Sequence, residues 1–450
     1  MRGDANVQRP SVVVVGGGFA GFFAAGALER LLPPQAADLT FISATDHLCY
    51  SPLLPEVAAG RLDPRRIAVP LRAGLRRTRV VQASVDDVDF DRQTLEVMAD
   101  HGSIGPVHWD RLALTTGSVT RTLPTPGVAT YALGLKTLVE AQYLHDHVLR
   151  QLELADCAQD PAECRARLTF LVVGAGYTGT ETAAQLQHMT TTQLDRFPGL
   201  RREDLRWLLV DLAPTILPEL GPRLGGAAMH TVRARGMEIR LGTSVTAMDD
   251  RSVSLSDGDT ISTHTVVWTV GVTPPPLVRH LSLPVRRGRL AVDDHLQLRD
   301  GVWAAGDSAA ARDPFSETDA DYPPTAQHAQ RQGVVMARNI AASLGCGRPR
   351  TYRHRDLGLV ADLGGVAAVA RPLGVPLTGP AAKVVAKAYH LYALPSAANR
   401  IRVGADWLTN LVSRPIAAQL GMVEPAAARL AREQTGGGGH GLNPPAFAGR

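Results

Sequence analysis

The chain has few cysteines, and none of them is placed for chemistry. Its 450 residues include only Cys49, Cys157, Cys164 and Cys346, with no C-x-x-C or C-x-x-x-x-C spacing. That absence argues against a redox-active disulfide, and in a reducing cytoplasm we expect no structural disulfide either. No histidine and cysteine residues have the spacing of metal ligands, so no metal site is predicted.

Long apolar runs and a strong charge are also absent. No stretch reaches about 18 uncharged apolar residues, so no membrane-spanning helix is predicted. The polar segment Met1–Pro10 lacks the apolar core of a secretory signal, which predicts a cytoplasmic chain. The net charge is only +4, without a basic run interleaved with aromatic residues, and this argues against nucleic-acid binding. Lysine is limited to Lys136, Lys383 and Lys387, which we interpret as a habit of composition.

What is present is an ordinary globular composition and a repeated glycine motif. A chain of 450 residues, 45% of them apolar, predicts two or three domains. Each copy of the motif has an apolar β-branched run, the spacing G-x-G-x-x-G and a helix-like segment, which together predict a strand, a phosphate-binding turn and a helix. The glycines are Gly16, Gly18 and Gly21 in the first copy and Gly174, Gly176 and Gly179 in the second.

Polar residues and glycines end the other predicted strands. Strand 39–43 ends in Ser43, where an acid that binds a ribose is usual, and the nearest acid is Asp46. Strand 205–211 does end in an acid, Asp211. Segments 112–117, 265–271 and 298–307 predict further strands that lead to Gly117, to Gly271 and to Gly306-Asp307.

The order of these segments predicts an α/β fold with two Rossmann-like dinucleotide-binding domains, the second inserted into the first. A separate C-terminal region, able to associate with a membrane, follows them. The expected divisions are 10–125 and 286–345 for the first domain, 126–285 for the second, 346–425 for the C-terminal region and 426–450 for a disordered tail.

Taken together, the motifs resemble the two-dinucleotide flavoproteins and, within them, the type II (non-proton-pumping) NADH dehydrogenases. The resemblance covers about residues 10–415. It rests on the motifs at 16–21, 51–60 (Ser-Pro-Leu-Leu-Pro-Glu-Val-Ala-Ala-Gly), 173–181, 305–307 (Ala-Gly-Asp) and 323–333 (Pro-Pro-Thr-Ala-Gln-His-Ala-Gln-Arg-Gln-Gly), with support from 389–395 and 401–412.

The resemblance implies two cofactor sites. FAD would lie in the first domain, with its pyrophosphate at the first set of glycines and its ribityl–phosphate end held by Asp307. NADH would lie over the second set, where Asp211 would favour the free 2′-hydroxyl of NADH over the phosphate of NADPH. Ser43, Gly117, Gly271 and Gly306 complete the expected cofactor-binding set.

The resemblance also implies a path for electrons from NADH through FAD to a quinone. Glu181 occupies the Gly-x-Glu position near flavin and nicotinamide; the alternative is an acid in the first turn of a helix, favoured by the helix dipole. The family places two glutamines beside the quinone. Gln327 matches the first, whereas Arg331 stands at the second and could serve a quinone oxygen or an anionic acceptor. The alternatives are a soluble reductase, an NADH oxidase or a non-catalytic NADH-sensing flavoprotein.

Apolar and basic residues share the stretch from Lys383 to Val412 at roughly helical spacing. Such a stretch can lie in a membrane interface, with Trp407 at the boundary, and this predicts peripheral attachment at the inner face of the cell membrane. The alternative is an amphipathic helix that covers the core or a dimer partner. The oligomeric state stays open, with a homodimer as one alternative.

Overall fold

The structure is a computed structural model and describes residues 9–318, 320–354 and 358–430. Its first sheet has the strand order β21-β22-β9-β1-β2-β5. All of its pairs are parallel except the edge pair β21–β22. The strands are β1 (Ser11–Val15), β2 (Asp38–Ser43), β5 (Arg79–Gln82), β9 (Arg111–Leu114), β21 (Gln297–Arg299) and β22 (Val302–Ala304).

The central strand β1 shows why the sequence folds this way. Side chains alternate between the two faces of a sheet, yet all of Val12 to Val15 are buried, so both faces are covered. On one side α1 (Phe19–Leu31) packs against α10 (Ala326–Ser343). A Cβ at Gly333 of α10 would clash with the main chain of Ala20, so the glycine allows the close approach of the two helices.

One predicted strand of this sheet was wrong. Segment 298–307 is not a single strand but the end of a hairpin between β21 and β22. The turn contains Asp300 and Gly301, and Gly301 has a φ of +72°, a left-handed conformation that glycine adopts without strain. Gly306 and Asp307 still follow β22 directly, as predicted.

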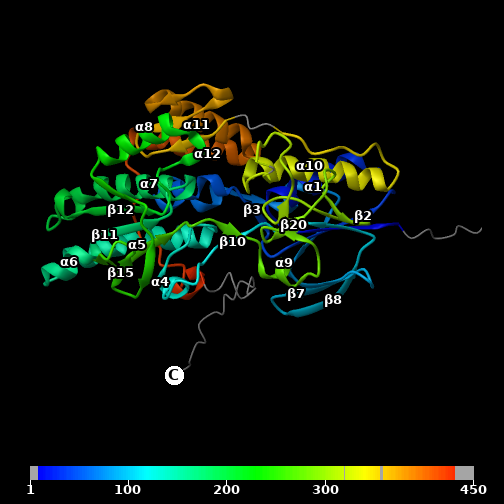
Figure 1. Cartoon of the computed structure of the whole chain (residues 1–450), viewed down its shortest axis with the longest axis horizontal. Coiled ribbons are helices and arrows are strands. Elements are labelled where there is room, and N and C mark those ends of the chain that lie inside the picture. The colour runs from blue at the N-terminus through cyan, green and yellow to red at the C-terminus, as the bar shows by residue number, and fades with distance from the viewer. Residues whose placement is uncertain (1–8, 319, 355–357, 431–450) are drawn as a thin grey trace, which may run out of the picture.

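The second sheet is entirely parallel, with the order β13-β12-β11-β17. Its strands are β11 (Thr169–Val173), β12 (Arg206–Asp211), β13 (Met237–Leu241) and β17 (Thr265–Trp268), and helices α5 (Leu138–Asp156), α7 (Tyr177–Gln193) and α8 (Pro222–Arg233) belong to the same half. Figure 1 shows the two sheets at opposite ends of the long axis, with the antiparallel pair β10 (Val119–Thr120) and β18 (Val272–Thr273) between them. The predicted α/β class with parallel sheets is confirmed.

Small antiparallel sheets and short elements complete the two halves. The sheets are β6 (Ser84–Asp89), β7 (Thr94–Ala99) and β8 (Gly102–His108); β14 (Val245–Met248), β15 (Ser252–Leu255) and β16 (Thr260–Ser262); β19 (Val285–Arg286), β20 (Arg289–Ala291) and β23 (Ala309–Ala310); and β3 (His47–Cys49) with β4 (Ala68–Pro70). The short helices are α2 (Leu54–Ala58), α3 (Leu71–Gly74), α4 (Val128–Tyr131), α6 (Pro161–Arg167) and α9 (Pro276–His280).

The C-terminal region forms a separate layer, drawn in orange above the second half in Figure 1. It consists of the sheet β24 (Val360–Asp362), β25 (Ala368–Ala370) and β26 (Leu377–Thr378), followed by α11 (Gly379–Ala393) and α12 (Ala397–Val412). Within the described part of the chain, none of the helices has both the length and the apolar character needed to cross a bilayer.

The disordered tail was predicted to begin too early. Residues Pro425–Ala428 form a 3₁₀ turn, and Leu430 is 1% exposed within the core of the second half. These apolar side chains contribute to the core, so residues 426–430 belong to the folded domain. The remainder of the predicted tail, 431–450, lies outside the described residues.

Candidate functional site

The first glycine motif forms an open turn between β1 and α1. Gly16 has a φ of +114°, and a Cβ there would clash with the carbonyl oxygen of Thr115. A Cβ at Gly21 would clash with the carbonyl oxygen of Gly16, so this glycine lets the helix approach the turn. A Cβ at Gly18, by contrast, would have no atom within 4 Å, so there is free space in front of the helix N-terminus. This is the space that a pyrophosphate needs.

The second motif repeats this geometry between β11 and α7. Gly174 has a φ of +103°, and a Cβ there would lie 2.6 Å from the carbonyl oxygen of Thr269. A Cβ at Gly179 would clash with Gly174, and a Cβ at Gly176 would again meet no atom within 4 Å. The described residues therefore place two dinucleotide cradles, one on each parallel sheet.

Two threonines that sequence reasoning missed close both turns. Thr115 Oγ1 donates to the carbonyl oxygen of Val15 at 2.7 Å and lies 3.2 Å from that of Gly16. Thr269 Oγ1 makes the same contacts to Val173 and Gly174, at 2.7 and 3.2 Å. The sequence signal was present, because each threonine stands two residues before a glycine, Gly117 or Gly271, at the end of a predicted strand.

The two strand ends differ in how their polar residues are used. Ser43 is 3% exposed, and its hydroxyl donates to the carbonyl oxygen of Thr45 at 2.7 Å and accepts from the Thr45 N–H at 3.2 Å. A Cβ at Gly17 would clash with this hydroxyl. Asp211 instead accepts hydrogen bonds from the N–H of Ala175 and, at 2.7 Å, from that of Ala213. The carboxylate thus lies directly against the second cradle.

Asp307 lies beside the first cradle and is held from two sides. Its side chain is 17% exposed, and Oδ2 accepts a hydrogen bond from the Ser118 hydroxyl at 2.6 Å. The N–H of Gly306, one residue earlier, donates to Gln332 Oε1 at 2.8 Å. Gln332 thereby connects α10 to the Gly306-Asp307 turn, a role that the sequence did not reveal.

The residues around this first cradle fit FAD, the group that the resemblance implies. The hydroxyls of Thr116 and Ser308 are buried, and neither has a hydrogen-bond partner among the described residues. Both flank residues expected in the site, Gly117 and Asp307. Buried hydroxyls without partners are uncommon in a folded protein, and the polyhydroxyl chain of a flavin would satisfy them.

Glu181 lies in the second turn of α7 and is partly buried. No acid stands in the first turn of this helix, so the alternative interpretation as a first-turn acid is wrong. Glu181 Oε1 accepts a hydrogen bond from the N–H of Asp362 at 2.6 Å. Burial raises the pKa of Glu181 to about 8, an increase that the carboxylates of Asp362 and Glu56 reinforce. The side chain can therefore keep a proton near neutral pH.

Two of the three lysines form ion pairs with the carboxylates of Asp362 and Glu56, which raise the pKa of Glu181. Lys383 Nζ donates to Asp362 Oδ1, and Lys387 Nζ donates to Glu56 Oε1 and lies 3.5 Å from Asp362 Oδ2. The side chains of Asp362 and Glu56 are only 8% and 4% exposed. Although burial opposes ionisation, the lysines hold the pKa of Asp362 below its usual range. The lysines of α11 therefore point inward.

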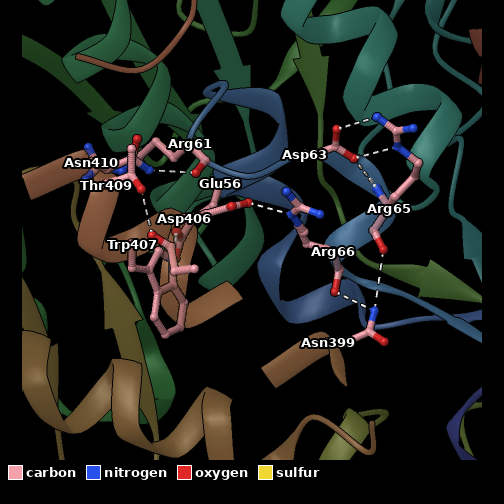
Figure 2. Close-up of polar contacts among 11 residues, drawn as sticks. Glu56, Arg61, Asp63, Arg65, Arg66, Asn399, Asp406, Trp407, Thr409 and Asn410 are labelled. Carbon is pink, nitrogen blue, oxygen red and sulfur yellow. Dashed lines mark hydrogen bonds and ion pairs between the residues drawn. The ribbon is translucent and has the colours of Figure 1, made fainter. Parts of the chain in front are cut away.

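Figure 2 shows how α12 is fixed to the loop that follows α2. Trp407 Nε1 donates to Glu56 Oε2 at 2.8 Å, and Arg66 Nε donates to Asp406 Oδ2 at 2.9 Å. Asn399, 4% exposed, donates to the carbonyl oxygen of Arg66 at 2.8 Å. One face of α12 thus binds the protein through polar contacts.

The opposite face of this layer is apolar and exposed. Tyr392 and Val384 of α11 are 79% and 69% exposed, and Val412 of α12 reaches 89%. Three further large apolar side chains of α12 are also exposed: Ile401 by 73%, Leu408 by 67% and Leu411 by 79%. Apolar residues are not often exposed in such numbers on one surface unless it is covered in use.

Gln327 and Arg331, the predicted acceptor pair, share one side of α10. Arg331 Nη1 donates to the carbonyl oxygen of Gln327 at 3.0 Å, and Gln327 Oε1 lies 3.1 Å from His354 Nε2. Arg331 and His354 line a cavity of about 280 Å³ together with Gln330, Val334, Val335, Tyr352 and Arg353. Gln327 is 9% exposed, so Arg331 is the member of the pair that faces this cavity.

None of the cysteines is placed for redox chemistry with a partner. Cys49 lies closest to the first cradle in sequence, and burial raises its pKa to about 12, so its thiol stays protonated. Among the described residues, no group of three or more histidine, cysteine or acidic side chains is arranged to hold a metal ion.

Comparisons with known proteins agree with this geometry. A family model described as pyridine nucleotide-disulphide oxidoreductase matches residues 10–333. Demethylphylloquinone reductase NdbB of Synechocystis sp. is 32% identical over 89% of this chain and 96% of its own. Type II NADH:quinone oxidoreductase Ndh of Mycobacterium tuberculosis is 30% identical over 90% of this chain and 89% of its own. The structure of NDH2 from Plasmodium falciparum in complex with NADH has the same fold, with a TM-score of 0.82 at 16% identity over 91% of this chain and all of that one.

Proposed function

The chain belongs to the pyridine nucleotide-disulphide oxidoreductase family, and within it to the type II NADH:quinone oxidoreductases; from this premise we propose that it transfers two electrons from NADH through FAD to a quinone, without pumping protons. One structural observation carries the proposal. The two parallel sheets present matched cradles, each with free space in front of a helix N-terminus. A chain with two such cradles can hold an electron donor and a flavin at once.

The first cradle is the FAD site of this proposal. Gly16, Gly18 and Gly21 would admit the pyrophosphate, while Asp307 and the flanking Gly117 and Gly306 turns would hold the ribityl chain. When bound there, FAD would supply the redox chemistry, as the carrier of two electrons between NADH and the acceptor.

The second cradle is the NADH site. Gly174, Gly176 and Gly179 would admit the pyrophosphate of NADH, and Gly271 would lie at the neighbouring strand end. The Asp211 carboxylate faces this cradle, so it can accept a hydrogen bond from the ribose 2′-hydroxyl and repel a 2′-phosphate. NADH should therefore be preferred over NADPH.

Reduction of a quinone to a quinol consumes two protons, and Glu181 can hold one of them. Its raised pKa of about 8 keeps the carboxyl protonated at neutral pH, and the N–H of Asp362 fixes its orientation. Gln327 and Arg331 would donate hydrogen bonds to the acceptor, with Arg331 supplying the stronger, charged donor.

Attachment to the inner face of the cell membrane would bring this site to a lipid-soluble quinone. The support is the exposed apolar face of α11 and α12, whose opposite face is fixed by Asn399, Asp406 and Trp407. A helix that is polar toward the protein and apolar toward solvent suits a lipid interface.

Flotation with anionic liposomes tests the attachment. Replacement of Leu408, Leu411 and Val412 by glutamine should abolish flotation, whereas Met98→Gln and Val285→Gln, at exposed apolar positions elsewhere, should not. Truncation before Lys383 is unsuitable because it would leave the buried carboxylates of Asp362 and Glu56 without their lysines. Flotation that survives the triple substitution would contradict the attachment.

Stopped-flow measurement of the two half-reactions tests the activity. NADH should reduce the flavin of the purified protein, and menaquinone or ubiquinone analogues should reoxidise it faster than oxygen does. Arg331→Met and Gln327→Leu should slow the second half-reaction and spare the first. Reoxidation by oxygen alone would favour an NADH oxidase, and a reduced flavin that no acceptor reoxidises would favour a sensor.

A further inference from the structure

All three lysines of the chain contact carboxylates that are largely buried. Lys383 and Lys387 pair with Asp362 and Glu56, as described above. The third, Lys136, lies 3.6 Å from Asp307 Oδ2, although 246 residues separate it from the nearest other lysine in the sequence. Lysines on a protein surface usually extend into solvent, whereas each of these three contacts a largely buried carboxylate. A low lysine content alone does not explain these positions.

Lys136 reaches Asp307 through a third side chain. Lys136 Nζ donates to Ser118 Oγ at 2.8 Å, and the Ser118 hydroxyl donates in turn to Asp307 Oδ2 at 2.6 Å. The side chains of Lys136 and Asp307 are 29% and 17% exposed. Among the described residues, Ser118 and Lys136 contact only Oδ2 of this carboxylate, so Oδ1 is left to accept from another donor.

The main chain of Lys136 is fixed by the adjoining helix α5 of the second half. Its N–H donates to Glu140 Oε2 at 2.6 Å, within the capping box that begins α5 at Thr137. Leu133, three residues earlier, bridges to Val267 of the second sheet. Lys136 therefore extends from the start of the second half into the first cradle, where β9 and β22 end.

We propose that Lys136 is a positioning residue of the flavin site. Its ammonium group holds the Ser118 hydroxyl and the Asp307 carboxylate in the orientation that binds the ribityl chain. It also offsets the negative charge of Asp307, which would otherwise repel the nearby pyrophosphate. The inference rests on the proposed function, because it concerns FAD binding at the first cradle.

The test measures FAD affinity of the apoprotein, not turnover. Lys136→Met keeps the aliphatic stem and the main-chain hydrogen bond to Glu140, and it removes the ammonium group with its charge and its hydrogen bond to Ser118. We expect the dissociation constant of FAD to rise about ten- to hundredfold, the range for loss of one charged hydrogen-bonding partner, with an unchanged melting temperature of the apoprotein. Lys136→Arg should recover part of the affinity. Arg150→Met, an exposed position on α5, serves as the matched control and should leave the affinity unchanged.

A double-mutant cycle with Asp307→Asn tests the path through the carboxylate, which both Ser118 and Lys136 contact. If Lys136 acts through Ser118 and Asp307, then Lys136→Met should add little to the loss already caused by Asp307→Asn. Fully additive losses would show an independent contact with FAD and overturn the positioning role, as would an unchanged dissociation constant or a loss matched by a lower melting temperature of the apoprotein. Wild-type protein that binds no FAD would overturn the proposed function itself, whereas normal wild-type binding with unaffected variants overturns only this inference.

Discussion

The two cradles have the same backbone geometry and differ in the side chains around it. Gly16 and Gly174 have φ values of +114° and +103°, and Thr115 and Thr269 close the turns with hydrogen bonds of identical length. The shared part is the part that a pyrophosphate needs: a left-handed glycine, a close helix and open N–H groups.

Among the matched positions at which the two cradles differ, three concern the strand end, the turn and the helix side chain. Gly17 and Ser43 in the first correspond to Ala175 and Asp211 in the second, and Phe23 of α1 corresponds to Glu181 of α7, each two residues after the last glycine. The first helix thus has an aromatic residue where the second has an acid with a raised pKa. The shared backbone geometry suits any dinucleotide, so we expect the strand end and the helix side chain to determine which dinucleotide binds and what chemistry follows.

The largest effect should come from filling one cradle at a time. Gly18→Leu should yield a folded but colourless protein, because a Cβ there meets no protein atom within 4 Å and the side chain enters the space that the pyrophosphate needs. Gly176→Leu should keep the flavin and lose reduction by NADH. Flavin absorbance and the melting temperature check both. Gly26→Ala on α1, where a Cβ makes ordinary contacts at 3.6 Å and beyond, is the control. Normal FAD content in Gly18→Leu would contradict the assignment of the first cradle.

The next effect concerns the pH dependence of stability at Glu181. Its pKa is raised from 4.5 to about 8, so the folded protein keeps a proton that the unfolded chain releases between these values. The contribution of Glu181 to stability is therefore fully present below pH 4.5 and is lost as pH rises through 8. Glu181→Gln lacks this loss, so between pH 4.5 and 8 its free energy of unfolding should rise relative to that of the wild type, by up to about 5 kcal/mol.

Denaturant unfolding at a series of pH values measures this difference. For Glu153→Gln, at an exposed position on α5, the free energy of unfolding should change with pH as it does in the wild type. If the free energy of unfolding of Glu181→Gln also changes with pH as that of the wild type does, then Glu181 is not held in its protonated form. The difference between Glu181 and Phe23 would then have no consequence for proton chemistry.

The sequence predicted the two cradles because their information is local. In each motif an apolar run, three glycines and the start of a helix lie within about twenty residues, and the strand that ends in Asp211 is likewise one continuous apolar segment. The Asp-Gly pair at 300–301 favours a turn, so the hairpin that replaces the predicted strand 298–307 also has a local signal in the sequence.

The parts that the sequence did not reveal depend on contacts between distant segments. Lys387 meets Glu56 across 331 residues, and Asp362 meets Glu181 across 181. No periodicity in a single segment encodes such a pair. The apolar spacing from Lys383 onward indicated amphipathic helices correctly, but it did not show that the lysines would point inward, because that depends on where the carboxylates of other elements lie.

A smaller effect is expected at the strand end of the second cradle. Asp211→Ala should narrow the preference for NADH over NADPH by roughly 1–3 kcal/mol, since it removes both a hydrogen-bond acceptor and a repulsive charge. Asp211→Asn keeps an acceptor and loses only the charge, so it separates the two causes. The ratio of kcat/KM for the two nucleotides is the measurement. Equal use of both by the unmodified protein would contradict the role of Asp211.

The smallest effect is expected at the matching position of the first cradle, Ser43. Its hydroxyl is already committed to the main chain of Thr45 on both its donor and its acceptor side, so it has little capacity left for a ribose. Ser43→Ala should cost about 1 kcal/mol of stability, because the Thr45 N–H loses its partner, while the dissociation constant of FAD should change less than about fivefold. Asp46, 73% exposed and 2.8 Å from His47 Nδ1, is the other polar group near this strand end, and Asp46→Ala should have an equally small effect. Titration of each apoprotein with FAD measures both. A rise of more than tenfold in either variant would show that this strand end binds the ribose as Asp211 is expected to do, and the contrast between the two cradles would then be confined to Phe23 and Glu181.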